Sequence, residues 1–202
     1  MGRPSNSDER RNQILTAFMK AIAKKGYSGA SIQEIAAEAD MTPGLIHYHF
    51  KSKQEILMTL FARLESLVKE RFLARIEQTG KELSPIMRLH SLIEAFLEVD
   101  QKSDELAVSS WTMISAEAIT NTELKRAYRE VVEKQLAELE EAIKVTLPSK
   151  RASQKTREIA SATLAAIHGS FLLALTTPGL IPKGSAAKSV KDMVDGMLAS
   201  VR

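Results

Sequence analysis

The stretch from Ser31 to Leu57 reads SIQEIAAEADMTPGLIHYHFKSKQEIL and decides the fold. It contains three helix starts in succession, each marked by a hydroxyl residue that can cap a helix: Ser31 with Glu34, Thr42 before Pro43, and Ser52 with Glu55. The first two starts lie close together, so their helices are short. We therefore predict two short helices joined by a tight turn and followed directly by a longer helix.

The two short helices have the pattern of a helix-turn-helix. Small and apolar residues of the first can pack against apolar residues of the second: Ile35, Ala36 and Ala39 against Ile46 and Phe50. Asp40 occupies the turn, where aspartate tolerates the left-handed backbone better than most residues do. The second helix is then the predicted recognition helix, whose first turn would face base edges in the major groove of DNA.

The polar residues of this predicted recognition helix are candidate DNA contacts. Its first turn holds Thr42, Pro43 and Gly44, where a hydroxyl and a missing side chain suit close approach to DNA. His47, Tyr48 and His49 offer polar tips for bases or phosphates, and Lys53 begins the next helix, whose free N–H groups favour phosphate. Arg10 and Arg11 on the preceding helix are expected to flank this surface with positive charge.

The charge distribution agrees with a polyanion contact near the N-terminus. Residues 1–53 hold eight Lys and Arg against five Asp and Glu, which accounts for the whole net charge of +3. The chain has no cysteine, which excludes disulfides and cysteine-ligated metals. It also lacks a glycine-rich phosphate loop, a His-Glu-x-x-His pair and a nucleophile elbow, so we expect no enzyme, no metal site and no cofactor.

The remainder of the chain has helical periodicity without convincing strand alternation. The N-terminus shows no signal-peptide pattern. The apolar stretch 159–175 is interrupted by polar residues and predicts a buried helix in place of a membrane span. We therefore expect about nine helices, an all-α fold, no membrane contact and a cytoplasmic location.

Residues 8–60 resemble the DNA-binding signature of the tetracycline-repressor (TetR) family. The shared features are a T/S-I-x-x-I-A start, an S/T-x-G turn and an aromatic, histidine-rich end before F-K-S/T-K-x-x-L. Asp40 replaces the usual glycine, and His47 stands where tyrosine is more typical. The opening GRP also resembles N-termini of this family, in which the arginine, here Arg3, reaches a minor groove. Carried over by position, the resemblance implies DNA contacts from a set of seven residues: Ser31, Thr42, Gly44, His47, Tyr48, His49 and Lys53.

Residues 80–200 resemble, more weakly, the choline-responsive BetI-type branch of that family. The cues are Trp111, the run 121–143 and the run ATLAAIHGSFLLAL at 162–175. The resemblance implies that the last two long helices form a four-helix bundle with a second subunit, through Ala165, Gly169, Leu172, Val190, Met193 and Met197. It also implies an effector pocket among the middle helices, for which the candidates are Phe96, Trp111, Met113, Tyr128 and Phe171. For a choline-type cation, Trp111, Tyr128 and Glu117 could supply an aromatic cage with nearby acidity.

We therefore expect three parts: a three-helix DNA-binding domain at 1–52, a long connecting helix at 53–79 and a larger effector and dimerisation domain at 80–202. The predicted function is a homodimeric DNA-binding regulator, in this family most often a repressor, released from a palindromic operator by an unidentified small molecule. Activation in place of repression stays open. Two alternatives also remain: a small-molecule-binding dimer with a vestigial DNA-binding head, and a DNA-bound regulator controlled by a protein partner. His90 and His168 are lone histidines whose roles the sequence leaves open.

Overall fold

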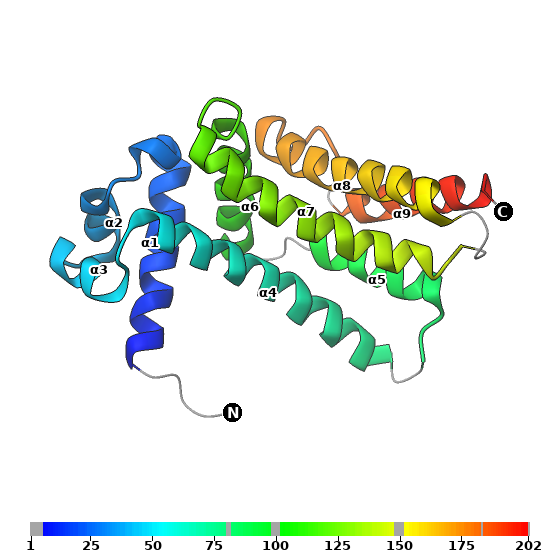
Figure 1. The fold of residues 1–202 in the computed structure, drawn as a ribbon, viewed down its shortest axis with the longest axis horizontal. Helices are drawn as coiled ribbons and strands as arrows, with labels where there is room; N and C mark the ends of the chain where they lie inside the picture. The colour runs from blue at the N-terminus through cyan, green and yellow to red at the C-terminus, as the bar shows by residue number, and fades with distance from the viewer. Residues whose placement is uncertain (1–5, 80–81, 98–101, 148–151, 183, 202) are drawn as a thin grey trace. The chain divides into compact units, whose positions relative to one another are not determined.

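The computed structural model describes residues 6–79, 82–97, 102–147, 152–182 and 184–201. These residues form nine α-helices and no strand (Figure 1), which confirms the predicted all-α class for the described chain. The helices are α1 (Asn6–Gly29), α2 (Ile32–Ala39), α3 (Pro43–His49), α4 (Lys53–Thr79), α5 (Pro85–Leu97), α6 (Lys102–Glu117), α7 (Thr122–Lys144), α8 (Ala152–Thr176) and α9 (Ser185–Ala199). The predicted minor-groove arginine, Arg3, lies outside the described residues.

The chain divides into two compact units. One comprises residues 1–65 with 101–128, and the other comprises residues 66–100 with 129–202. The division falls inside α4 and α7, and it places α6 in the same unit as the three N-terminal helices. The three-part division expected from the sequence stays a prediction.

The first unit is built around α1, which packs against α2, α3 and α6. Figure 1 shows α2 and α3 lying beside α1. Phe18 and Ile22 of α1 are fully buried with Ile35 of α2 and Ile46 of α3. On the side of α6, the hydroxyl of Ser110 donates to the backbone carbonyl of Met19 over 3.1 Å. Both short helices and α6 therefore pack on α1.

The turn and caps of the helix-turn-helix follow from local sequence. Ser31 Oγ accepts the N–H of Glu34 over 3.2 Å, and Thr42 Oγ1 accepts the N–H of Leu45 over 3.3 Å. Asp40 ends α2 in the left-handed conformation, with φ 52° and ψ 49°. The three predicted local features are confirmed, because each one depends on residues no more than four positions apart.

The second unit has its own apolar core, formed by residues of α5, α7, α8 and α9. Leu89 and Ile93 of α5 are fully buried with Ile143 of α7, Ile167 of α8 and Val194 of α9. Helices α8 and α9 lie side by side in Figure 1 and are in contact. The amphipathic pattern of α5, α9 and the part of α7 from residue 129 onward is satisfied inside this unit.

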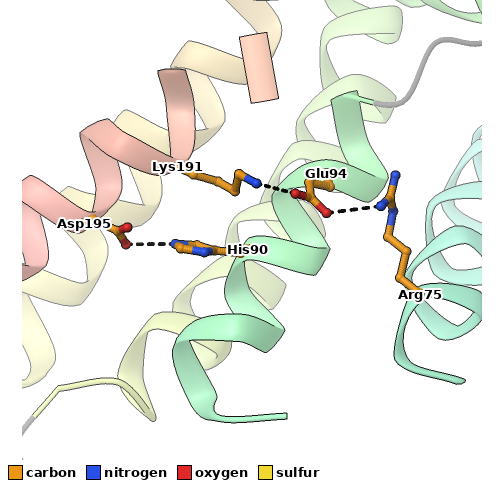
Figure 2. A network of polar contacts seen from close by, with 5 residues as sticks. All are labelled: Arg75, His90, Glu94, Lys191 and Asp195. Atoms are coloured by element: carbon orange, nitrogen blue, oxygen red, sulfur yellow. Dashed lines mark hydrogen bonds and ion pairs between the residues drawn. The ribbon is translucent and has the colours of Figure 1, made fainter. Parts of the chain in front are cut away.

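A polar network crosses the second unit from α4 to α9. Figure 2 shows Glu94 of α5 between two cations: its carboxylate accepts from Arg75 Nη1 over 3.1 Å and from the ammonium of Lys191. Beside it, His90 Nε2 lies 2.8 Å from Asp195 Oδ1. The network joins three helices through side chains that are less than half exposed.

Helix α8 is more exposed than the sequence predicted. Its segment Lys155–Thr176 is long and apolar enough to cross a membrane by length and composition, but 28% of the residues in its most apolar window are buried in the chain. The first half is buried at Ile159 and Ile167, whereas Leu172 and Leu173 are 48% and 44% exposed. Core helices of soluble proteins pass the same length test, so the segment is weak evidence for a membrane. The expectation of a buried helix holds for its first half.

Candidate nucleic-acid interface

Helix α3 presents five of the predicted contact residues on one exposed surface. These are Thr42, Pro43, Gly44, His47 and Tyr48. Tyr48 is 82% exposed, the highest value among the large apolar side chains of the described chain. Its ring contacts the neighbouring His49 edge-on, with 5.1 Å between ring centroids. So exposed a ring adds little to the packing of its own chain and is available to a partner.

The opposite side of α3 anchors the helix. Ile46 and Phe50 are 0% and 1% exposed. Gly44 lies on the open side, where an added Cβ would meet Thr42 Oγ1 at 3.9 Å, an ordinary contact. The fold of this chain therefore does not itself require glycine at position 44. A partner molecule that approaches the backbone of α3 closely would be a physical reason for glycine there.

Three predicted contacts are already engaged within the chain or partly buried. Ser31 caps α2, and His49 is partly buried. Lys53 donates from Nζ to the carbonyl of Tyr27 over 2.9 Å and lies 4.2 Å from the Tyr27 ring centroid. Burial lowers the pKa of Lys53, while the charges of Glu117 and Glu123 oppose that shift. The Lys53 ammonium is thus turned inward in this structure.

The two arginines that were expected to flank the surface differ in placement. Arg10 is exposed and donates to Gln13 Oε1 over 2.9 Å. Arg11 is turned inward and donates from Nη1 to the carbonyl of His49. Gln13 in turn donates to the carbonyl of Ala39 over 2.8 Å. Sequence reasoning missed both backbone contacts, because their partners lie 38 and 26 residues away and no local pattern marks them.

The predicted effector residues fall into both units. In the first unit, Trp111 of α6 packs against Tyr128 of α7 with 5.0 Å between ring centroids, and against Phe61 of α4 at 5.8 Å. Burial raises the pKa of Tyr128 to about 12. Met113 of the same unit is 39% exposed. In the second unit, Phe96 belongs to the apolar core and Phe171 packs against it. The structure thus brings Trp111 and Tyr128 together and adds Phe61 to them.

Glu117, considered as the acidic partner of a cationic ligand, has another contact in the structure. Its carboxylate accepts the backbone N–H of Ser28 over 2.8 Å and also accepts the Ser28 hydroxyl. The end of α6 is therefore tied to the end of α1. Sequence reasoning had no signal for this pair, which is separated by 89 residues.

The predicted dimer residues of α8 and α9 differ in exposure. Ala165 and Leu172 are exposed, whereas Gly169, Met193 and Met197 are partly buried. A Cβ added to Gly169 would meet nothing within 4 Å, so the space above this glycine is open. Val190 is 4% exposed and packs in the core of its own unit.

Comparison with known families agrees with this arrangement. The profile of the bacterial regulatory proteins of the tetR family matches residues 14–59, and that of the BetI-type transcriptional repressor C-terminal region matches residues 85–199. The HTH-type transcriptional regulator BetI of Rhizobium meliloti is 26% identical over 117 residues, 58% of this chain and 56% of that relative. The chain thus spans little more than half the length of this curated relative. BetI of Burkholderia ambifaria is 23% identical over 192 residues, 95% of each chain.

Solved structures show the same fold. A TetR-family transcriptional regulator from Rhodococcus sp. has a TM-score of 0.77 at 22% identity and covers 95% of this chain and 99% of its own. A transcriptional regulator from Saccharomonospora viridis in complex with choline has a TM-score of 0.67 at 24% identity and covers 95% and 96%. The resemblance predicted from the residues is confirmed. The chain belongs to the tetR family of bacterial regulatory proteins, with a C-terminal region of the BetI-type transcriptional repressors.

Proposed function

We propose that this protein is a DNA-binding transcriptional repressor that binds a palindromic operator as a homodimer and is released by a small-molecule effector. The observation that carries the proposal is the exposed face of α3, where Tyr48 projects into solvent beside the open Gly44. Its position within the matched tetR region supports it further. The protein then acts on DNA in the cytoplasm as a regulator and has no catalytic step.

DNA contact would begin at the N-terminal turn of α3. Thr42 and Gly44 stand there, so the helix can approach base edges in the major groove end-on. Tyr48 and His47 lie further along the exposed face, where their polar tips suit phosphate oxygens. Two copies of α3, about 34–36 Å apart, would reach successive major grooves and so require a palindromic operator.

The exposed half of α8 supports dimerisation. Leu172, Leu173 and Leu175 are each more than a third exposed on a helix of high hydropathy. A second copy of the same surface would cover these leucines by an isologous contact. Ala165 and Gly169 are small enough to let two α8 helices approach closely. Met193 and Met197 of α9 are partly buried and pack against the apolar core of the second unit.

The effector class we propose is a choline-type quaternary cation. The choline complex of the Saccharomonospora viridis regulator and the BetI relatives support it. In this chain the faces of Trp111 and Tyr128 are the candidate partners for such a cation, because aromatic faces attract quaternary ammonium groups. By linkage, an effector that weakens operator binding is itself bound more weakly by the DNA complex, by the same factor.

The test is a fluorescence-anisotropy titration with duplex DNA from upstream of the protein's own gene, at two salt concentrations and with non-specific competitor. We expect tight, salt-sensitive binding that survives competitor. Tyr48→Ala should weaken it about tenfold or more, and Tyr48→Phe should show how much the hydroxyl contributes. Arg129→Ala is the control, since Arg129 is 77% exposed and pairs with Glu133 in the other unit.

Choline is then added to the wild-type complex. Release of the DNA supports the effector class, and unchanged anisotropy contradicts it while leaving the DNA-binding result standing. If the wild-type protein binds no duplex at either salt concentration, the DNA-binding proposal is wrong and the small-molecule-binding alternative gains weight.

A further inference from the structure

Arg11 of α1 holds the carboxyl end of the recognition helix. Its Nη1 donates to the backbone carbonyl of His49, the last residue of α3. Carbonyl groups in the final turn of a helix have no partner within the helix. A cation there also interacts favourably with the partial negative charge of the helix end. The guanidinium therefore supplies both a hydrogen-bond donor and a positive charge at the carboxyl end of α3.

The same guanidinium contacts the turn that follows α3. Arg11 Cζ lies 4.0 Å from the centroid of the Phe50 ring, and Arg11 Nη2 lies 3.9 Å from Glu55 Oε1. Glu55 Oε2 accepts the N–H of Lys51 over 2.8 Å, while the N–H of Glu55 is capped by the hydroxyl of Ser52 over 3.1 Å. The turn between α3 and α4 is thus fixed from α1 on one side and from α4 on the other.

A helix as short as α3 needs this support. It has seven residues, about two turns, and so little intrinsic stability that contacts with other elements must set its direction. Its buried anchors are Ile46, at the middle of the helix, and Phe50, the residue that follows its last turn. Gln13 makes a parallel contact to the carbonyl of Ala39, the last residue of α2. Side chains of α1 therefore hold the ends of both short helices.

We infer that Arg11 is a positioning residue for the recognition helix, and that operator selectivity depends on the contacts of its guanidinium with α3 and the following turn and not on attraction of its charge to DNA phosphate. The inference rests on the proposed function, in which α3 contacts DNA. The Arg11 side chain is 33% exposed and is engaged by His49, Phe50 and Glu55. Base contacts need the direction of α3 to be fixed, whereas non-specific phosphate attraction does not.

The experiment compares Arg11→Lys, Arg11→Gln and the control Arg129→Gln, which removes an exposed arginine of the other unit. Each protein is titrated with the operator duplex and with a non-specific duplex of equal length, over a series of salt concentrations. We expect Arg11→Lys, which keeps the charge, to lose about tenfold or more in operator affinity, because an ammonium lacks the planar fork that engages His49, Phe50 and Glu55 together. The non-specific affinity and salt slope of Arg11→Lys should stay at wild-type values, and Arg129→Gln should keep the wild-type ratio of the two affinities.

Two results would overturn the inference. One is wild-type selectivity in Arg11→Lys together with a salt slope reduced by about one in Arg11→Gln, which is the signature of a phosphate contact. The other comes from hydrogen exchange without DNA. If the inference holds, amide exchange in Arg11→Lys and Arg11→Gln is faster than in wild type only at the carboxyl end of α3, including the Phe50 N–H that donates to the carbonyl of Ile46. Uniform loss of protection over α1, α2 and α3 would make Arg11 a general stability residue.

The same exchange measurement separates this inference from the proposed function. If the wild-type protein selects no operator, the proposed function fails, whereas the hold of Arg11 on α3 is still tested by exchange in the free protein.

Discussion

The carboxylate of Glu117, the last residue of α6, accepts both the backbone N–H and the hydroxyl of Ser28, which lies two residues after Gly26, where the backbone of α1 departs from helical geometry. The approach is close: a Cβ on Gly26 would lie 3.2 Å from Glu117 Oε2, and Gly26 has a φ of 73°, a backbone conformation that favours glycine. Since α6 also carries Trp111, this contact connects the aromatic candidate for effector binding to the helix that supports α2 and α3.

The first prediction concerns this contact. Glu117→Gln removes the charge and one acceptor oxygen of this contact. We expect operator affinity without choline to change less than about threefold. The loss of affinity caused by choline should shrink, because a coupling free energy between two sites is typically only about 1–3 kcal/mol and this contact joins α6 to α1. The measurement is the operator titration with and without choline. Glu105→Gln, an exposed position in the first turn of α6, is the control. An unaltered choline response in Glu117→Gln would show that α6 does not act through Ser28.

The second prediction concerns Gly44. Alanine fits the space at this position, and alanine favours a helix over glycine, so Gly44→Ala should raise the free energy of unfolding by about 0.5–1 kcal/mol. Operator affinity should nevertheless fall about tenfold or more, because the methyl group would separate α3 from DNA. Chemical denaturation and anisotropy measure the two effects. Wild-type operator affinity would mean that the backbone at Gly44 stays away from DNA.

The third prediction concerns the exposed half of α8. Leu172→Arg places a charge on the proposed interface, so the protein should sediment as a monomer and bind the operator more weakly, since the two heads are no longer linked. Ile119→Arg is a matched control, because Ile119 is 74% exposed in the other unit. A Leu172→Arg protein that remains dimeric would place the interface elsewhere.

The fourth prediction concerns the network in Figure 2. Glu94→Gln leaves Arg75 and Lys191 without their shared carboxylate, so the free energy of unfolding should fall by about 1–2 kcal/mol. Urea denaturation at fixed protein concentration measures the change. Glu133→Gln breaks an exposed ion pair in the same unit and should cost less than about 1 kcal/mol. Equal losses of unfolding free energy in the two variants would show that partial burial does not increase the stabilisation from this network.

The fifth prediction concerns pH. Burial lowers the pKa of His168 to about 4 from an ordinary value of 6.5. Between these values the unfolded chain binds more protons than the folded chain, so stability should fall as the pH drops from about 6.5 to about 4 and should be insensitive to this group above that window. Urea denaturation at pH 7 and pH 5 should show a loss that is about 1–2 kcal/mol larger in wild type than in His168→Gln. Equal losses would mean that His168 titrates normally.

Local sequence determined the elements of the DNA-binding region. Ser31, Thr42 and Ser52 start their helices through hydrogen bonds that span three residues, and Asp40 makes the turn by its own backbone conformation. The long helix was predicted with the bounds that the structure shows, Lys53 to Thr79. These features were predictable because caps and turns depend on side chains and backbone groups that are adjacent in the chain.

The sequence also selected the exposed face of α3, since Thr42, Gly44 and Tyr48 are polar or small at positions opposite Ile46 and Phe50. The sequence did not decide which charged side chains remain exposed and able to contact DNA. Lys53 was expected to contact DNA and Arg11 to flank the contact surface with positive charge, yet the structure turns the first to Tyr27 and the second to His49. Long basic side chains have many rotamers, and the choice among them depends on acceptors that other helices bring near.

Contacts between distant segments were decided by tertiary structure alone. Ser28 and Glu117 are separated by 89 residues, and Ser110 reaches Met19 across 91. No periodicity links such positions. These contacts follow from the packing of α6 on α1, which buries apolar side chains of both helices and brings the polar groups between them within hydrogen-bonding distance.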